Sequence, residues 1–343
     1  MAGEVLVTGG SGFIAGWCVI GLLQQGYRVR TTVRDLGKEA AVRATIGKVT
    51  DPGDRLSVHA ANLMADAGWD DAAAGCDYVL HVASPLGVAE PKDPDELIVP
   101  AREGAKRVVQ AAIKAGAKRV VLTSSVAATS KGEEAGDDWM ADESCWTDAN
   151  DKRVGAYARS KTLAERAAWD LITGQGGPTS LATVNPTLVL GPVLSQDYSG
   201  SVQVVERLLS GRVPGIPRLG FNVVDVRDVA DLHIRAMTDP AAGGQRFIAA
   251  GSFAWMADIA EVLRKNLDKK DAAKVPSRKA PDMVVKMASM VDKDLGSVVD
   301  RLGQKHDFTS AKAQNQLGWR PRPMQETVLD CAKSLIAEGV VAT

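Results

Sequence analysis

Short runs of β-branched residues alternate with longer segments of helical spacing over the first 185 or so residues of this chain. The strand candidates are EVLVTG, RVRTTV, RLSVHAAN, DYVLHVA, KRVVLTSS and SLATVNPTLVLG. A regular alternation of strands and helices predicts a parallel sheet with helices on both faces. We therefore predict an α/β chain built on a doubly wound parallel sheet of the Rossmann type.

The pattern loosens after Pro186, where glycine and proline become frequent, and it resumes as strand, helix and strand over about 221–250. A helical segment, WMADIAEVLRK, and a final amphipathic helix after Pro323 follow. These features predict that the chain folds into two parts. Residues 1–185 plus about 221–250 form a nucleotide-binding domain, and about 186–220 plus 251–343 form a smaller, discontinuous α/β substrate-binding lobe.

Composition favours small-molecule chemistry. The chain has 343 residues, 45% of them apolar, and a formal charge of -1, which gives no basic field for nucleic acid or an anionic membrane. The four cysteines are far apart, and His59, His81, His233 and His306 show no ligand spacing, so neither a metal site nor a disulfide framework is expected. Without a long apolar run or a signal-like amino terminus, we expect a cytoplasmic monomer or homodimer.

A glycine-rich turn follows the first strand candidate in VLVTGGSGFIAGW. Gly9, Gly12 and Ala15 have the spacing GxxGxxA, and glycine permits both a sharp turn and the close approach of a pyrophosphate to the backbone. The helix that follows presents its unpaired N–H groups to that phosphate. The alternative is an ordinary strand-to-helix turn, but its place after the first strand favours nucleotide binding.

The end of the second strand, RVRTTVRD, indicates which nucleotide binds. An acidic residue there would accept hydrogen bonds from a ribose 2′-hydroxyl, but Arg34 occupies the position and Lys38 follows it. A guanidinium matches a 2′-phosphate, so we predict NADP(H). The alternative is that Arg28, Arg30 and Arg34 only form a solvated strand edge, and Asp35 beside Arg34 leaves that alternative open.

Tyr157 precedes Lys161 by one helical turn in the segment AYARSKTLAERAAWDLITG, so both side chains lie on one helix face. An ammonium about 5 Å away, at an effective dielectric of about 20, stabilises a phenolate by roughly 3 kcal/mol. This predicts a tyrosine of lowered pKa that acts as an acid. The pair alone is a common coincidence, so its context decides.

Ser124 and Ser125 supply that context, because they end the fifth strand, where ligands of doubly wound sheets bind. A serine hydroxyl there can bind a substrate carbonyl while Tyr157 protonates it. Turn or cap chemistry is the alternative for a Thr-Ser-Ser run. A glycine loop, a serine after strand five and a later Tyr/Lys pair nevertheless form one site in a consistent order.

The chain resembles the extended short-chain dehydrogenases/reductases, and within them the dihydroflavonol reductase, cinnamoyl-CoA reductase and bacterial aldehyde or ketone reductase group. The motifs VTGGSGFIA, TTVRD, GCDYVLHVASP, VVLTSS, DESCW, YARSKTLAE, NPTLVLGP and DVRDVA carry this resemblance over nearly the whole chain. The resemblance implies that Ser125, Tyr157 and Lys161 are catalytic. It also implies cofactor contacts from Gly9, Gly12, Phe13, Ile14, Arg34, Lys38, Asn62, Leu63, Val82, Ala83, Ser84, Tyr157, Lys161, Pro186, Val189 and Ser201. Asn62 stands where relatives usually carry an acidic residue that faces the adenine.

The predicted reaction is NADPH-dependent reduction of a small to medium aldehyde or ketone. Ser130 stands where flavonoid reductases carry an asparagine that recognises a flavonoid hydroxyl. This difference argues against a flavonoid substrate. The alternatives are an NAD-dependent nucleotide-sugar epimerase or dehydratase and a non-catalytic NADP-sensing protein. Arg34 disfavours the first, and the intact Ser/Tyr/Lys set disfavours the second.

Two groups of large side chains each have two interpretations. Trp139 and Trp146 are expected to pack, with the entrance of the site as the alternative. Met283, Met287 and Met290 share one helical face, where core packing is expected and a pocket wall or lid is the alternative.

Overall fold

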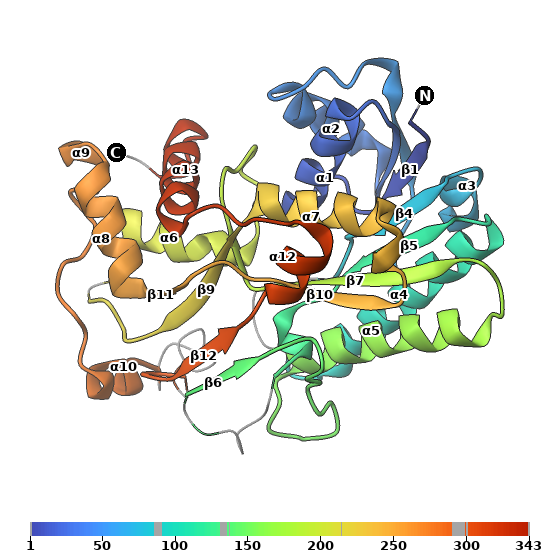
Figure 1. Ribbon diagram of the computed structural model, residues 1–343. Coiled ribbons are helices and arrows are strands. Elements are labelled where there is room, and N and C mark those ends of the chain that lie inside the picture. The colour runs from blue at the N-terminus through green and yellow to red at the C-terminus, as the bar shows by residue number, and fades with distance from the viewer. Residues whose placement is uncertain are drawn as a thin grey trace.

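A seven-stranded parallel sheet forms the centre of the molecule (Figure 1). The computed structural model describes residues 2–85, 91–130, 136, 138–213, 215–289, 299 and 301–341. The strand order is β10-β7-β5-β4-β1-β2-β3, and every neighbouring pair is parallel. The strands are β1 (Glu4–Val7), β2 (Arg28–Val33), β3 (Leu56–Ala60), β4 (Tyr78–His81), β5 (Arg119–Thr123), β7 (Ser180–Pro186) and β10 (Gln245–Ala249). The prediction of a Rossmann-type doubly wound sheet is confirmed.

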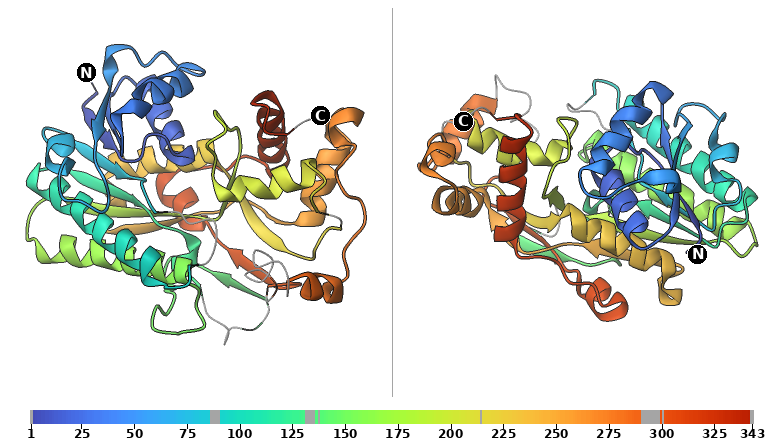
Figure 2. Two further views of the ribbon diagram at one scale, coloured as in Figure 1. Left: turned by 180° about the vertical axis from the view of Figure 1, so that it is seen from behind. Right: turned by 90° about the horizontal axis from the view of Figure 1, so that it is seen from above.

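Helices cover both faces of this sheet. One face carries α1 (Phe13–Gln24), α2 (Glu39–Gly47) and α7 (Val226–Thr238). The other carries α3 (Trp69–Ala73), α4 (Asp95–Lys114) and α5 (Ala156–Gly174), and α4 lies along α5 (Figure 2). Because both faces are covered, the central residues of β1, β4 and β5 are fully buried apolar side chains.

A second, three-stranded sheet has the order β11-β9-β8 and consists of β8 (Leu188–Leu190), β9 (Gly220–Asp225) and β11 (Phe253–Trp255). It packs with α6 (Gln203–Leu209), α8 (Met256–Asn266) and α13 (Met324–Ala337) in a separate apolar cluster. The polypeptide continues from α8 through α9 (Lys269–Ala272) and α10 (Asp282–Ser289). A two-stranded sheet of β6 (Asp138–Ala141) and β12 (Lys305–Phe308), together with α12 (Ala311–Leu317), completes the described elements.

Two strand assignments differ from the sequence pattern. The run 180–191 reads as one strand, but β7 ends at Pro186 and β8 pairs with β9 in the second sheet. The strand near 221 was expected with the nucleotide-binding strands, but β9 joins β8 and β11 instead. A local strand pattern does not specify which sheet a strand joins. The division into two domains stays a prediction.

The expected core role of the methionines is wrong for the two that are described. Met283 is 74% exposed and Met287 is 65% exposed on α10, whereas Met290 lies outside the described residues. Helical spacing places side chains on one face, but it does not show whether another element covers that face. The packing role of the tryptophans is confirmed: Trp139 stacks on His306 with ring centroids 4.5 Å apart, and Trp146 lies under Arg246.

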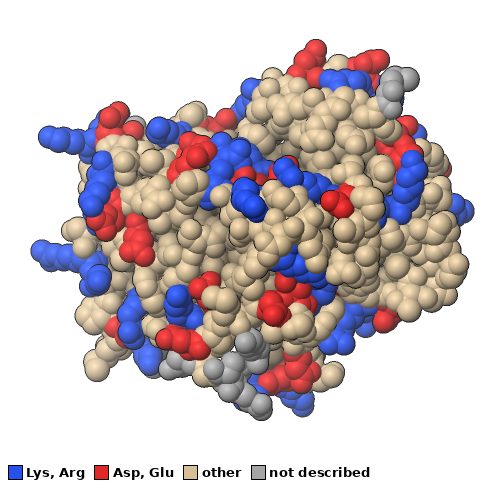
Figure 3. All heavy atoms as spheres, in the orientation of Figure 1, with Lys and Arg blue, Asp and Glu red and all other residues tan. Residues whose placement is uncertain are grey.

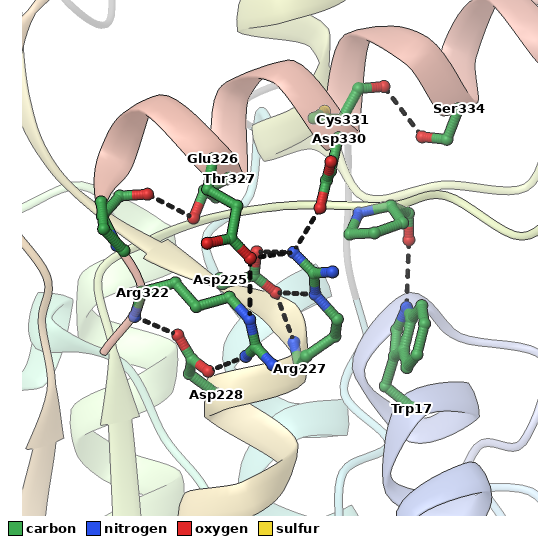
Figure 4. Close-up of polar contacts among 12 residues, drawn as sticks. Trp17, Asp225, Arg227, Asp228, Arg322, Glu326, Thr327, Asp330, Cys331 and Ser334 are labelled. Carbon is green, nitrogen blue, oxygen red and sulfur yellow. Dashed lines mark hydrogen bonds and ion pairs between the residues drawn. The ribbon is translucent and has the colours of Figure 1, made fainter. Parts of the chain in front are cut away.

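A network of charged side chains, the joint network, connects the start of α7 to α13 (Figure 4). Asp225 caps α7 and binds Arg227 through both carboxylate oxygens at 2.7 and 2.9 Å, and Arg227 also pairs with Asp330 at 2.8 Å. Asp228 accepts hydrogen bonds from the backbone and the guanidinium of Arg322. The network therefore ties a helix of the central sheet to the apolar cluster of the second sheet.

The face shown in Figure 3 carries interspersed acidic and basic side chains. Among the described residues, no helix is long and apolar enough to cross a membrane, and no group of ligating side chains is placed to hold a metal ion. The four cysteines, Cys18, Cys76, Cys145 and Cys331, are free thiols.

Candidate active site

The glycine loop after β1 lies against the loop after β4, where the order of strands in the sheet reverses. Gly9 has a φ of +78°, and a Cβ added there would be 3.0 Å from the Cβ of Ala83. Gly12 has a φ of -83°, so it needs no left-handed conformation, and its added Cβ would meet the carbonyl oxygen of Gly9 at 3.2 Å. Gly10 is tighter than either, because its Cβ would lie 2.2 Å from Thr31 Oγ1.

Thr8 holds the loop after β4 in place. Its buried hydroxyl oxygen accepts the N–H groups of Val82 and Ala83, each at 3.0 Å, and it contacts His81 Nδ1 at 2.9 Å. Since both lone pairs are used, the hydroxyl proton points to His81, which accepts it as a neutral ring. Burial and the nearby Lys161 lower the pKa of His81 to about 3, consistent with that neutral state.

The first turn of α1 fits a phosphate group. Gly12 is its N-cap, no side chain caps the helix, and its first turn holds no acidic residue. The N–H groups at this end are therefore available to an anion. A cavity of about 200 Å³ adjoins the loop and is lined by Ser11, Gly12, Phe13, Lys38, Thr45 and Tyr198, among others.

The charged residues of β2 and of the segment that follows it separate into bonded and free groups. Arg30 pairs with Glu4 at 2.7 Å, and Arg28 donates to the carbonyl of Asp54. Asp35 accepts the Gly37 N–H at 2.9 Å and caps a short turn. Within the described part of the chain, the side chains of Arg34 and Lys38 have no recorded partner, and both are exposed. The cations expected to bind a 2′-phosphate are therefore available.

The remaining residues expected to contact a cofactor lie at or near the carboxyl ends of the central strands. Asn62 follows β3, and its side chain accepts the Met64 N–H; Leu63 beside it packs against Gly104 of α4. Val189 and Ser201 meet directly, because Ser201 Oγ donates to the Val189 carbonyl at 2.6 Å. The others are placed as follows: Phe13 and Ile14 in the first turn of α1, Val82, Ala83 and Ser84 after β4, and Pro186 at the end of β7.

The structure distinguishes the two serines after β5. Ser124 points into the interior and donates to Glu165 at 2.5 Å. Ser125 accepts the Ala127 N–H at 3.1 Å and forms a side-chain hydrogen bond with Tyr157. Ser125 is therefore the serine that the fold pairs with the tyrosine, as the family resemblance implies.

Tyr157 and Lys161 both lie in the first two turns of α5, and their electrostatics differ from the sequence-based expectation. Burial of the phenol group raises the pKa of Tyr157, and the hydrogen bond from Ser125 opposes this, although the residue keeps 38% of its surface exposed. Lys161 is buried and its ammonium donates to the Thr123 carbonyl at 3.4 Å. The expected net lowering of the Tyr157 pKa is wrong here, because desolvation of the phenol outweighs the hydrogen bond from Ser125.

Sequence reasoning missed the buried polar residues behind this site. Glu165 is 0% exposed and pairs with Arg246 at 2.7 Å, and Asn185 connects Glu165 to the Ser125 carbonyl. One signal was available for Glu165. This acidic residue lies one turn beyond Lys161, on the helix face whose other residues form the buried apolar stripe. Arg246 carries no such local signal.

Known proteins agree with this geometry. The family model "NAD dependent epimerase/dehydratase family" matches residues 5–251. Cinnamoyl-CoA reductase 2 from Arabidopsis thaliana is 37% identical over 265 residues, which are 76% of each chain. Tetraketide alpha-pyrone reductase 1 from the same plant is 34% identical over 345 residues, covering 99% of this chain and 98% of the relative. The NADPH complex of yeast methylglyoxal/isovaleraldehyde reductase Gre2 superimposes with a TM-score of 0.82 at 27% identity, over 98% of this chain and 100% of that one.

The chain belongs to the NAD-dependent epimerase/dehydratase family, that is, to the extended short-chain dehydrogenases/reductases that its motifs predict. This prediction is confirmed. The named relatives are reductases, which supports an oxidoreductase activity for this chain.

Proposed function

We propose that this protein reduces a small to medium aldehyde or ketone to an alcohol with NADPH. The observation that carries the proposal is the juxtaposition of Ser125 and Tyr157, with Lys161 one turn further along α5, at the carboxyl end of β5. Ligands of doubly wound sheets bind at this edge. The glycine loop after β1 ends at the same edge and can hold the cofactor pyrophosphate.

The charges after β2 favour NADPH over NADH. Arg34 and Lys38 are exposed in the described structure without a recorded partner, and Asp35 is already bonded to the Gly37 backbone. A free guanidinium binds a dianionic phosphate through two parallel hydrogen bonds. The NADPH bound to the structurally similar Gre2 supports the same choice.

The side chains of the site have complementary roles. Bound NADPH supplies the hydride for the carbonyl carbon. Tyr157 donates its phenolic proton to the carbonyl oxygen, and the raised pKa of its phenol keeps that proton in place at neutral pH. Ser125 donates a hydrogen bond to the same oxygen, and the Lys161 ammonium stabilises the tyrosinate that remains. The carbonyl gains one hydride and one proton and becomes an alcohol.

The substrate class rests on Ser130 and on the relatives. Ser130 lies five residues beyond Ser125, at the position where flavonoid reductases carry the asparagine that recognises a flavonoid hydroxyl. The structurally similar Gre2 is a methylglyoxal/isovaleraldehyde reductase, and both of these compounds are small carbonyl compounds. We therefore place compact aldehydes and ketones ahead of polyphenols as substrates.

The decisive experiment follows oxidation of NADPH, with NADH as the comparison, by purified protein over aliphatic and aryl aldehydes, ketones, ketoesters and a dihydroflavonol. We expect substrate-dependent oxidation of NADPH that falls about 10²- to 10⁴-fold in Tyr157→Phe. Tyr27→Phe, outside the site, is the matched control and should keep wild-type turnover. Oxidation that survives in Tyr157→Phe would overturn the mechanism, and tight NAD binding without reduction would favour an epimerase.

A further inference from the structure

Glu165 is the centre of a buried polar cluster directly behind the candidate active site. Its carboxylate accepts hydrogen bonds from the residue that follows β5, from β7 and β10, and from its own helix. The donors are Ser124 Oγ at 2.5 Å, Thr183 Oγ1 at 3.1 Å, Asn185 Nδ2 at 3.0 Å, Arg246 Nε at 2.7 Å and Trp169 Nε1 at 3.4 Å. These donors fill the acceptor capacity of a carboxylate, so its position is fixed from several directions.

Arg246 extends the cluster to the segment that follows Ser125. Its guanidinium donates to the carbonyls of Ala128, Glu143 and Cys145, at 3.3, 2.8 and 2.7 Å. It also lies over the Trp146 ring, 3.7 Å from the centroid. Glu165, through Arg246, therefore fixes the path of the chain after the end of β5.

The cluster reaches Ser125 and Lys161 by short paths. Asn185 Nδ2 donates to the Ser125 carbonyl at 3.2 Å while it also donates to Glu165. Ser124, the neighbour of Ser125, is held by the same carboxylate. Lys161 precedes Glu165 by one turn of α5, so their side chains share a helix face.

We propose that Glu165 is a positioning residue: its buried carboxylate fixes the end of β5 that carries Ser125 and places a negative charge one turn from the Lys161 ammonium. The proposal rests on the proposed function, because Ser125 and Lys161 are its site residues. It adds a role for a side chain that touches neither substrate nor cofactor.

The charges around Lys161 define what Glu165 does electrostatically. Burial lowers the pKa of Lys161 to about 8, and the Glu165 carboxylate opposes this shift. Two other titratable groups lie near Lys161 in the described structure: His81 on β4 and Tyr157 one turn earlier on α5. Burial lowers the pKa of His81 and raises that of Tyr157, so both are neutral near pH 8. Arg246 on β10 pairs with Glu165 at 2.7 Å. Removal of the carboxylate takes away the negative charge that opposes the desolvation of Lys161 and leaves the hydrogen bond to the Thr123 carbonyl.

The test measures NADPH affinity of the full chain between pH 6 and pH 9.5. In the wild type, we expect affinity to fall as the pH rises through about 8, because Lys161 loses its charge. In Glu165→Gln, the midpoint of this fall should move down by about one pH unit or more, since the opposing charge is gone. Lys161→Met should show no such fall, which assigns it to that lysine.

A second variant controls for loss of folding, because Glu165→Gln leaves the buried guanidinium of Arg246 without its charged partner. The double variant Glu165→Gln/Arg246→Met removes both charges and should show the same lowered midpoint. Thr183→Val is the matched control: it removes one donor to Glu165, keeps the charge, and should keep the wild-type midpoint. A wild-type midpoint in both Glu165 variants, with NADPH still bound, overturns the positioning role alone. Absence of NADPH binding by the wild type overturns the proposed function as well.

Discussion

The molecule contains two clusters of carboxylate and guanidinium groups that differ in burial. In the cluster behind the candidate active site, the side chains of Glu165 and Arg246 are 0% and 8% exposed. In the joint network, those of Arg227 and Arg322 are 22% and 36% exposed (Figure 4). The first cluster is closed to water, whereas the guanidinium groups of the second stay partly solvated where two packing units meet. We therefore expect the first cluster to resist the loss of a partner less well than the second.

The largest difference is expected when one arginine is removed from each cluster. Arg246→Ala leaves the Glu165 charge buried without its partner and should lower the free energy of unfolding by about 3–5 kcal/mol. Arg322→Ala removes a guanidinium that is 36% exposed, and the Arg322 backbone N–H still binds the buried Asp228 carboxyl, so it should cost less, about 1–2 kcal/mol. Urea unfolding followed by circular dichroism measures both. Equal losses would remove the distinction between the clusters, and Arg235→Ala, which breaks an exposed pair on α7, is the control.

Arg34 differs from the arginines of both clusters, because its side chain has no recorded partner in the described structure. Arg34→Glu should weaken NADPH binding about 10- to 100-fold, the effect of losing charge-assisted hydrogen bonds worth about 1.5–3 kcal/mol. NADH binding should change far less. Isothermal titration with both nucleotides measures the effect. Arg28→Glu at the start of β2, where Arg28 is bonded to the Asp54 carbonyl, should bind NADPH as the wild type does.

The smallest expected effect is the pH response of the joint network. Burial raises the pKa of Asp228 to about 6, above its value of about 3.9 in an unfolded chain. The folded state therefore holds this proton more tightly, and the resulting stabilisation is complete below about pH 4 and is lost as the pH rises through about 6. The wild type should lose stability relative to Asp228→Asn across this range, which thermal unfolding at several pH values measures.

Asp231→Asn provides the control for that experiment, because Asp231 forms an exposed pair with Arg235 on the same helix. Its stability relative to the wild type should stay nearly constant over the range. A constant difference for Asp228→Asn as well would show that the buried carboxyl does not titrate with a raised pKa.

The sequence predicts the features that depend on neighbours along the chain. The glycine loop after β1, Ser125 after β5 and the Tyr157/Lys161 spacing are each local, and parallel strands bring their carboxyl ends to one edge of the sheet. The fold and the place of the candidate site follow from these features together. The roles of the site residues stay proposals.

Contacts between distant segments could not be predicted in this way. Glu165 on α5 and Arg246 on β10 are separated by 81 positions, and they meet because α5 packs against β7 and β10 lies beside β7 in the sheet. Gly10 is confined by Thr31 on the next strand, a contact that no glycine motif specifies. The exposure of Met283 and the raised pKa of Tyr157 depend on what surrounds each side chain, which spacing does not reveal.

The hydroxyl of Thr8 has a consequence for how a nucleotide is recognised. Because it takes the N–H groups of both Val82 and Ala83, neither residue can donate a backbone hydrogen bond to a ligand. At this stretch the loop offers only carbonyl oxygens and small apolar surfaces, up to the hydroxyl of Ser84. We therefore expect this stretch to select a bound nucleotide by its shape, and we expect the start of α1 and the cations after β2 to supply the polar contacts.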